Sequence, residues 1–217
     1  RHEPTSTSRI SAKISLNKGV NKVEINNKDN FMIDNKVYIN MPEDSDLKVL
    51  IISNQESSFI RDAFQSIPNT IVDFAEPPII NNYNYDIIIF EEVKPSLILP
   101  GTFIEIGKKV EAGTSLVIMA QENLQLIDTA NLLPVDIITT DTRETPIINN
   151  RLFEFTKDMS FGISNKHLVA NLKRNSTFVL AETLENIPII TYDNYGNGNI
   201  IYYGVFDDFN SFKISTD

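Results

Sequence analysis

The run Lys48-Val-Leu-Ile-Ile-Ser-Asn54 is short and apolar, is β-branched at three of its four central positions, and ends in small polar residues. A strand that is apolar on both faces is typical of the middle of a parallel sheet, with helices covering either side. Two later runs, residues 85–90 and 115–120, have the same character. Apolar residues recur at helical spacing over 59–67 and 103–110, between these runs. We therefore predict an α/β fold, a three-layer sandwich with a central, mostly parallel sheet.

The start of the chain has a different pattern. Residues 10–16, 21–26 and 37–41 alternate apolar and polar side chains, which is typical of half-buried strands. Three antiparallel strands cannot close a core by themselves. We therefore predict that residues 1–44 are the end of a β-sandwich or an appended sheet, and that residues 45–217 form the α/β domain. The chain begins at Arg1 without Met, so we expect a processed product or a piece of a longer protein.

Strand patterns continue after the third apolar run. The runs that we predict to be strands lie at 135–140, 146–148, 152–155, 177–182, 187–192 and 200–206. The last two flank the segment Asn194-Tyr-Gly-Asn-Gly-Asn199, whose Asn and Gly residues tolerate positive φ. We therefore predict that the chain closes with a β-hairpin.

Composition excludes several classes of function. The chain has 19 Lys and Arg against 29 Asp and Glu, a net charge of −10, which argues against nucleic acid and anionic membranes as partners. It has no Cys, so thiol nucleophiles, disulfides and thiolate metal sites are excluded. With two His, a His-rich metal site is not expected. No run approaches the ~20 apolar residues of a membrane-spanning helix.

Polar side chains follow each of the three predicted parallel strands. Open α/β sheets bind ligands beyond the C-terminal ends of their strands. The candidate ligand-binding residues at this edge are Asn54, Glu91, Glu92, Gln121 and Glu122. Their carboxylates could bind a divalent cation or act as an acid/base pair, or they could be solvated loop acids, which we favour. We assign no catalytic residue, no metal site and no cofactor.

Three segments together resemble a known family. Gly113-Thr-Ser-Leu-Val-Ile118 opens the strand that would carry a nucleophile, Ile187 to Gly204 resembles a characteristic closing hairpin, and Asp29 to Tyr38 resembles a segment that precedes such domains. Over roughly residues 20–206 the chain resembles the class I glutamine amidotransferase-like, flavodoxin-like domains of surface and membrane-anchored proteins of the aerotolerance-operon type. The resemblance implies an extracellular or membrane-anchored location.

The chain departs from this family at the position of the nucleophile. Active members hold a Cys in a sharp strand-to-helix elbow bounded by glycines, paired with a His and an acid. Here the elbow would fall at Ala120-Gln-Glu-Asn123, which has no Cys, Ser or Gly. The resemblance therefore implies a degenerate domain without the family's nitrogen-releasing chemistry.

Other polar and aromatic groups also favour structural roles. His167 could act as a base or a metal ligand, but it has no acid nearby in sequence and no His four residues away, so we interpret it as structural. Asp29, Asp34 and the pair Asp207-Asp208 lack the spacing of a calcium loop, which favours turn capping. The tyrosines near the predicted hairpin could form a sugar or peptide platform, but we favour cross-strand packing. They are Tyr192, Tyr195, Tyr202 and Tyr203.

These observations favour a non-catalytic interaction or scaffold module within a larger surface or membrane-anchored protein. Its expected partner is another protein or a neighbouring domain of the same chain, with no nucleic acid and no direct membrane contact. Two alternatives stay open: a carboxylate- or cation-dependent hydrolase that uses Glu91, Glu92 or Glu122, and a small-ligand binding domain at the same edge. The missing nucleophile argues against an enzyme.

Overall fold

The computed structural model describes residues 11, 13–17, 19–25, 35–41, 46–55, 59–150, 156 and 158–206. The chain divides into two compact units, residues 1–45 and 46–217. In the first unit β1 (Gly19–Glu24) pairs antiparallel with β2 (Lys36–Met41). The strand predicted over 10–16 is absent from its described residues, 11 and 13–16, so this part of the prediction is wrong.

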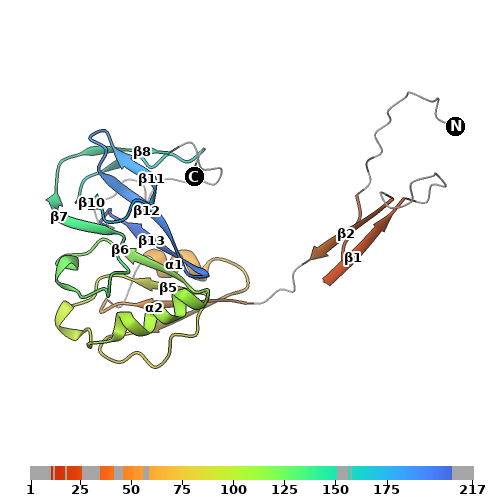
Figure 1. The fold of residues 1–217 in the computed structure, drawn as a ribbon, viewed down its shortest axis with the longest axis horizontal. Helices are drawn as coiled ribbons and strands as arrows, with labels where there is room; N and C mark the ends of the chain where they lie inside the picture. The colour runs from red at the N-terminus through yellow and green to blue at the C-terminus, as the bar shows by residue number, and fades with distance from the viewer. Residues whose placement is uncertain are drawn as a thin grey trace. The chain divides into compact units, whose positions relative to one another are not determined.

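The second unit is built around a nine-stranded sheet in the order β4-β3-β5-β6-β13-β12-β11-β8-β9 (Figure 1). A two-stranded sheet, β10-β7, accompanies it. The strands are β3 (Leu47–Ile52), β4 (Thr70–Ala75), β5 (Ile87–Phe90), β6 (Ser115–Met119), β7 (Val135–Asp141), β8 (Thr145–Asn149), β9 (Ile163–Ser164), β10 (His167–Leu172), β11 (Phe178–Thr183), β12 (Pro188–Tyr195) and β13 (Gly198–Tyr203). The helices are α1 (Phe59–Gln65), η1 (Pro95–Leu97), α2 (Thr102–Ala112) and η2 (Leu124–Leu126).

The three apolar runs are neighbouring parallel strands, as predicted. β3 pairs parallel with β5, and β5 pairs parallel with β6, so that Leu50, Ile88 and Leu116 lie side by side. All three side chains are buried. β4 adds to β3 on one side and β13 adds to β6 on the other, both in parallel. Five parallel strands therefore end at one edge.

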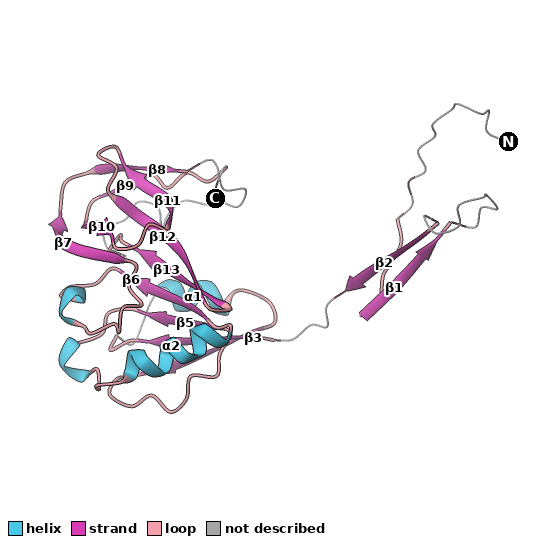
Figure 2. Cartoon of the chain, viewed as in Figure 1, coloured by secondary structure: helices cyan, strands magenta, loops and turns pink. Residues whose placement is uncertain are grey.

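The predicted three-layer α/β sandwich is wrong. Beyond β13 the sheet turns antiparallel and continues through β12, β11, β8 and β9, so the sheet is mixed. The described residues hold two α-helices, α1 and α2, which Figure 2 shows beside a much larger area of strand. The segment between β6 and β7 holds only the short 3-10 helix η2 and is otherwise irregular.

The physical reason is that an apolar strand face needs apolar cover, and the cover does not have to be a helix. One face of the parallel strands packs against α2, against the irregular segment that follows β6, and against β10. Phe103 and Ile106 come from α2, Leu132 from the irregular segment and Leu168 from β10. The other face, which includes Val49, Ile51, Ile89 and Met119, packs against the partly buried Ile60 and Phe64 of α1. Coil and strands thus cover much of what we assigned to helices.

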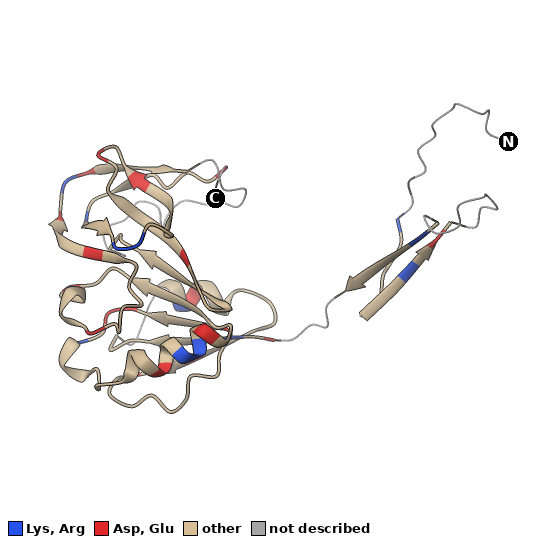
Figure 3. Cartoon of the chain, viewed as in Figure 1, with Lys and Arg blue, Asp and Glu red and all other residues tan. Residues whose placement is uncertain are grey.

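The solvent side of α2 is mixed in charge. Figure 3 shows that acidic and basic residues lie along this helix, and the Lys108 ammonium lies 2.6 Å from the Glu105 carboxylate. Such an exposed pair contributes only ~0–1 kcal/mol to stability. The inward face of α2 therefore carries most of its stabilising contacts, through the buried Phe103, Ile106 and Val110.

The predicted C-terminal hairpin is present as β12 and β13. Its tip lies against the end of α2, where the Asn197 backbone N–H donates to the Glu111 carbonyl at 3.0 Å. A Cβ atom at Gly198 would overlap the Thr114 and Val110 carbonyl oxygens. This close backbone approach explains why glycine is required there.

Candidate functional site

The predicted ligand-binding residues do lie at one edge of the sheet, since each follows a parallel strand. Asn54 comes after β3, Glu91 and Glu92 after β5, and Gln121 and Glu122 after β6. The strands β3, β5 and β6 are adjacent and parallel. What these side chains contact decides whether the edge is available to a ligand.

The Gln121 side chain is hydrogen-bonded to the backbone of the neighbouring loop. It is 1% exposed, and its amide makes two hydrogen bonds to one residue of the neighbouring loop. The Val93 backbone N–H donates to Gln121 Oε1 at 2.9 Å, and Gln121 Nε2 donates to the Val93 carbonyl at 2.9 Å. Two well-made bonds to a buried backbone satisfy groups that would otherwise be costly to bury. The Gln121 side chain therefore joins the loop that follows β6 to the loop that follows β5, a contact called the Gln121 clamp below.

Asn54 has a similar role. Its Oδ1 accepts from the Lys94 backbone N–H at 3.0 Å, and its Nδ2 donates to the Pro77 carbonyl at 3.1 Å. Its own backbone N–H donates to the Glu92 carbonyl at 3.2 Å. One half-buried side chain therefore joins the loops that follow β3, β4 and β5.

The three carboxylates differ in their surroundings. Glu91 is 3% exposed, and its backbone N–H donates to the Ile52 carbonyl at 3.1 Å. Glu92 has a left-handed backbone, φ 44°, and accepts a long hydrogen bond of 3.4 Å from Gln55 Nε2. Glu122 is more exposed, and one of its oxygens lies 2.5 Å from the Lys166 ammonium. The structure thus brings the five predicted residues to one edge, where each side chain has different surroundings.

A second cluster, which sequence reasoning did not assemble, surrounds His167 at the start of β10. The chain beyond β13 pairs with this region: His167 and Val205 form a β-bridge, and the Leu168 backbone N–H donates to the Gly204 carbonyl at 2.8 Å. His167 therefore lies just beyond the C-terminal end of the fifth parallel strand. We missed this position because we did not predict that β13 pairs in parallel with β6.

The His167 ring is buried with its hydrogen bonds unmade. The residue is 1% exposed, and neither ring nitrogen has a hydrogen-bond partner within the part of the chain that the structure describes. An unsatisfied buried polar atom costs ~1–3 kcal/mol. Burial lowers the pKa of His167, which favours the neutral ring; Arg143 lowers it further, while Asp141 and Glu185 act in the opposite direction. The structural role predicted for His167 accounts for its burial but not for its two unmade hydrogen bonds.

Asp141 and Arg143 form a tight ion pair next to His167. Asp141 ends β7 and lies opposite His167 in the β7/β10 register. Arg143 Nη2 donates to Asp141 Oδ2 at 2.6 Å, and its Nε donates to the same oxygen at 2.9 Å. Hydrogen bonds from the Arg143 side chain and backbone hold the pKa of Asp141 down at about 2. Asp141 is therefore ionised at neutral pH, with its charge matched by the guanidinium.

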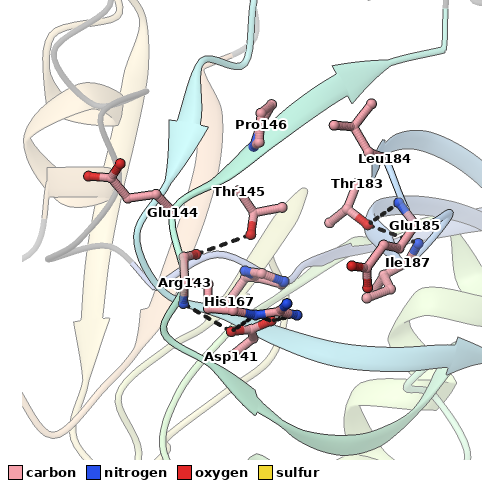
Figure 4. A pocket seen from close by; sticks show the side chains of 10 residues that line it. All are labelled: Asp141, Arg143, Glu144, Thr145, Pro146, His167, Thr183, Leu184, Glu185 and Ile187. Atoms are coloured by element: carbon pink, nitrogen blue, oxygen red, sulfur yellow. Dashed lines mark hydrogen bonds and ion pairs between the residues drawn. The ribbon is translucent and has the colours of Figure 1, made fainter.

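These groups line a hollow of about 200 Å³ on this part of the molecule (Figure 4). Its remaining walls include Pro146, Leu184 and Ile187. Figure 4 shows the His167 ring beside the Asp141–Arg143 pair, Glu185 across the hollow on the turn between β11 and β12, and the Glu144 carboxylate directed away. Pockets for drug-sized ligands run from ~300 to 1,000 Å³, so this hollow suits a smaller group.

The other groups weighed from sequence add no site. Asp29, Asp34, Asp207 and Asp208 lie outside the described residues, as does the strand predicted at 152–155. Among the described residues, no group of three His, Cys, Asp or Glu side chains could hold a metal ion. Tyr192 donates from its hydroxyl to Asn199 Oδ1 at 2.6 Å and packs near the Phe178 ring, a cross-strand contact of the kind that we favoured.

The fold is similar to those of several solved structures. The cytoplasmic proteins STM1381 from Salmonella typhimurium LT2 and STM3548 from Salmonella typhimurium each have a TM-score of 0.60, at 15% and 13% identity, and each match covers 73% of this chain. The matches cover 88% and 87% of those two proteins. The β-galactosidase from Rahnella sp. R3 has a TM-score of 0.55 at 16% identity, over 78% of this chain and 30% of the enzyme. At such identities the likeness concerns the fold alone.

Two sequence predictions are corrected by these findings. The resemblance to a flavodoxin-like glutamine amidotransferase is wrong, because the mixed, strand-rich sheet matches the proteins above and the family identified below is a different one. The extracellular or membrane-anchored location is also withdrawn, because the names of the two Salmonella proteins describe them as cytoplasmic. Within the described residues, no helix has the length and apolar character required to span a membrane.

Sequence comparison identifies the family. No curated protein matches the chain significantly. A family model does match: the domain of unknown function DUF7408, over residues 48–217, which is most of the chain and all but the start of the second unit. The chain therefore belongs to the DUF7408 family.

Proposed function

We propose that residues 46–217 form a non-catalytic module that binds a protein partner or a neighbouring domain of its own chain. The observation that carries this proposal is the state of Gln121. Its amide is buried and makes both of its hydrogen bonds to the Val93 backbone. Its bonds hold two loops of the edge together, so its amide is not available to contact a substrate.

The remaining edge residues support the same conclusion. Asn54 joins three loops, and the Glu122 carboxylate is paired with the Lys166 ammonium. That ammonium also lies 4.2 Å from the centre of the Phe206 ring, so it is held on two sides. A general acid or base must be able to reach a substrate proton. These contacts favour a packed edge over a reaction site.

The competing function is a carboxylate- or cation-dependent hydrolase that uses Glu91, Glu92 or Glu122. A test of both uses the full chain and the triple variant Glu91→Gln, Glu92→Gln, Glu122→Gln. Thermal unfolding is measured with and without Mg²⁺, Ca²⁺ and Mn²⁺. Because a ligand that binds the folded state raises Tm, a cation site would appear as a Tm increase in the parent that the triple variant loses. We expect no such increase in either protein.

A matched control separates a specific site from general charge effects. Glu76 is exposed at the same edge, after β4, and Glu76→Gln removes one carboxylate without touching the three candidates. A cation-dependent Tm increase that Glu76→Gln keeps and the triple variant loses would overturn the proposal. Cross-linking in living cells provides the positive arm: parent and triple variant should be linked to the same partner with equal yield. Loss of that partner in the triple variant would place function at the carboxylates.

A further inference from the structure

We propose that the hollow at His167 binds one protonated amino group on an alkyl stem, such as the side chain of a lysine from a partner protein; this deepens, and rests on, the proposed interaction function. The first observation is the buried imidazole. His167 lines the hollow, is 1% exposed, and has two ring nitrogens without a hydrogen-bond partner among the described groups. A neutral imidazole has one acceptor nitrogen, and no group in the described part of the chain donates to it.

Charge selects the kind of donor. The Glu144 carboxylate is directed away, so the titratable groups that face the hollow are Asp141, Glu185, Arg143 and the imidazole; with a neutral ring the carboxylates outnumber the guanidinium by one. The guanidinium of Arg143 already binds Asp141 through two of its nitrogens. Glu185 has no ion pair within the described part of the chain, and it faces the hollow (Figure 4). The unmatched charge is negative, so a cation is favoured over an anion.

The shape of the hollow and the chemistry of its walls favour an alkylammonium over other cations. Pro146, Leu184 and Ile187 supply apolar wall, which suits the methylene stem of an alkylammonium whose head reaches the polar floor. A bare divalent ion is disfavoured, because the described residues hold no cluster of three metal-ligating side chains. With about 200 Å³ of space the hollow accepts a side chain or a small amine and excludes a nucleotide-sized ligand.

Arg143 sets the access to the imidazole. Its side chain is 71% exposed and lies beside the ring (Figure 4). Removal of the guanidinium would uncover the ring, free the Asp141 carboxylate and remove a like charge from the path of the ammonium. Arg143→Ala is therefore expected to strengthen amine binding, whereas Glu185→Gln is expected to weaken it. Changes of opposite sign at two lining residues are hard to obtain from a loss of structure.

The experiment is an NMR titration of the full chain with butylammonium. The sequence has two histidines, so the His2→Gln variant leaves the His167 Cε1–H signal as the single imidazole probe. We expect a saturable shift of that signal with butylammonium and none with butanol or acetate. Glu185→Gln should weaken the affinity about three- to fivefold, the scale of one partly exposed charge pair. Glu76→Gln, an exposed carboxylate remote from the hollow lining, should leave it unchanged.

Each other outcome has a defined meaning. A shift with acetate, an equal response to butanol, or no saturable response to butylammonium would overturn the amine site. Tighter binding of Nα-acetyl-lysine N-methylamide, which keeps its side-chain ammonium, than of butylammonium would identify the source as a protein lysine. Equal binding of the two would identify a free amine. The NMR titration and the Tm measurement with Mg²⁺, Ca²⁺ and Mn²⁺ are independent. Absence of amine binding would therefore overturn the amine site without changing the result of the Tm test of the proposed function.

Discussion

The two hydrogen bonds of Gln121 can be tested by removing them while keeping the volume of the side chain. In Gln121→Leu the Val93 backbone N–H and carbonyl both lose their 2.9 Å partners. Gln121 and Val93 are 1% and 3% exposed, so water does not readily replace the amide. The substitution therefore leaves a donor and an acceptor buried without partners.

The magnitude follows from those two groups. Each buried unsatisfied backbone group costs ~1–3 kcal/mol, and the apolar side chain recovers part of that cost, so we expect a loss of about 2–4 kcal/mol in the free energy of unfolding. This is a large share of the ~5–15 kcal/mol that stabilises a typical domain. The matched control is Gln125→Leu, because Gln125 is exposed in η2 and should change stability by no more than ~0.5 kcal/mol.

Urea denaturation at neutral pH, followed by circular dichroism, measures both variants. A loss below ~1 kcal/mol for Gln121→Leu, or an equal loss for Gln125→Leu, would refute the clamp. Gln121→Glu adds a pH signature, because an ionised carboxylate cannot donate to the Val93 carbonyl but a protonated one can. Burial raises the folded-state pKa of the introduced carboxyl above ~4.3, so the defect relative to the parent should be smallest at acid pH and grow as pH rises.

Three further predictions concern titratable and polar groups. Tyr202 is fully buried, and its hydroxyl has no hydrogen-bond partner in the described structure. Tyr202→Phe should therefore leave the urea midpoint unchanged or raise the free energy of unfolding by up to ~1 kcal/mol, whereas a clear loss would reveal a missed partner. Arg143→Gln should raise the pKa of Asp141 from about 2 toward ~3.9, as measured by carboxyl ¹³C NMR, and an unmoved pKa would contradict the ion pair. In the parent, the stabilisation from this pair is fully present above the ordinary carboxyl pKa and is lost as pH falls toward about 2. Burial lowers the pKa of His167, so the unfolded chain binds the proton more readily and stability should fall as pH drops below ~6.5. His167→Gln should make the urea midpoint less dependent on pH, and an unchanged dependence would show that another group titrates.

The core of the sheet could be predicted because its signal is local. Within the three runs, residues 49–52, 88–90 and 118–120 are apolar and buried at consecutive positions, which requires a strand with both faces covered. The closing hairpin was predictable for a similar reason, since the turn at 194–199 holds Asn and Gly where the backbone reverses, with Gly196 at φ 61°. What covers the strand faces was not predictable, because Leu132 and Leu168 have no local signal that directs them to the same face as Phe103.

The candidate site divides in the same way. That Asn54 and Gln121 would lie at one edge follows from parallel strands alone, but whether an amide faces a ligand or its own backbone depends on loops that only the folded chain brings together. His167 and Asp141 come together through the register of β10 on β7, and Glu185 reaches them from the turn of a second strand pair, β11 and β12. The sequence alone therefore determined which segments are buried strands, because burial is encoded in consecutive residues. Only the tertiary structure decided which polar groups meet, because long-range strand pairing, which local patterns do not encode, sets their distances.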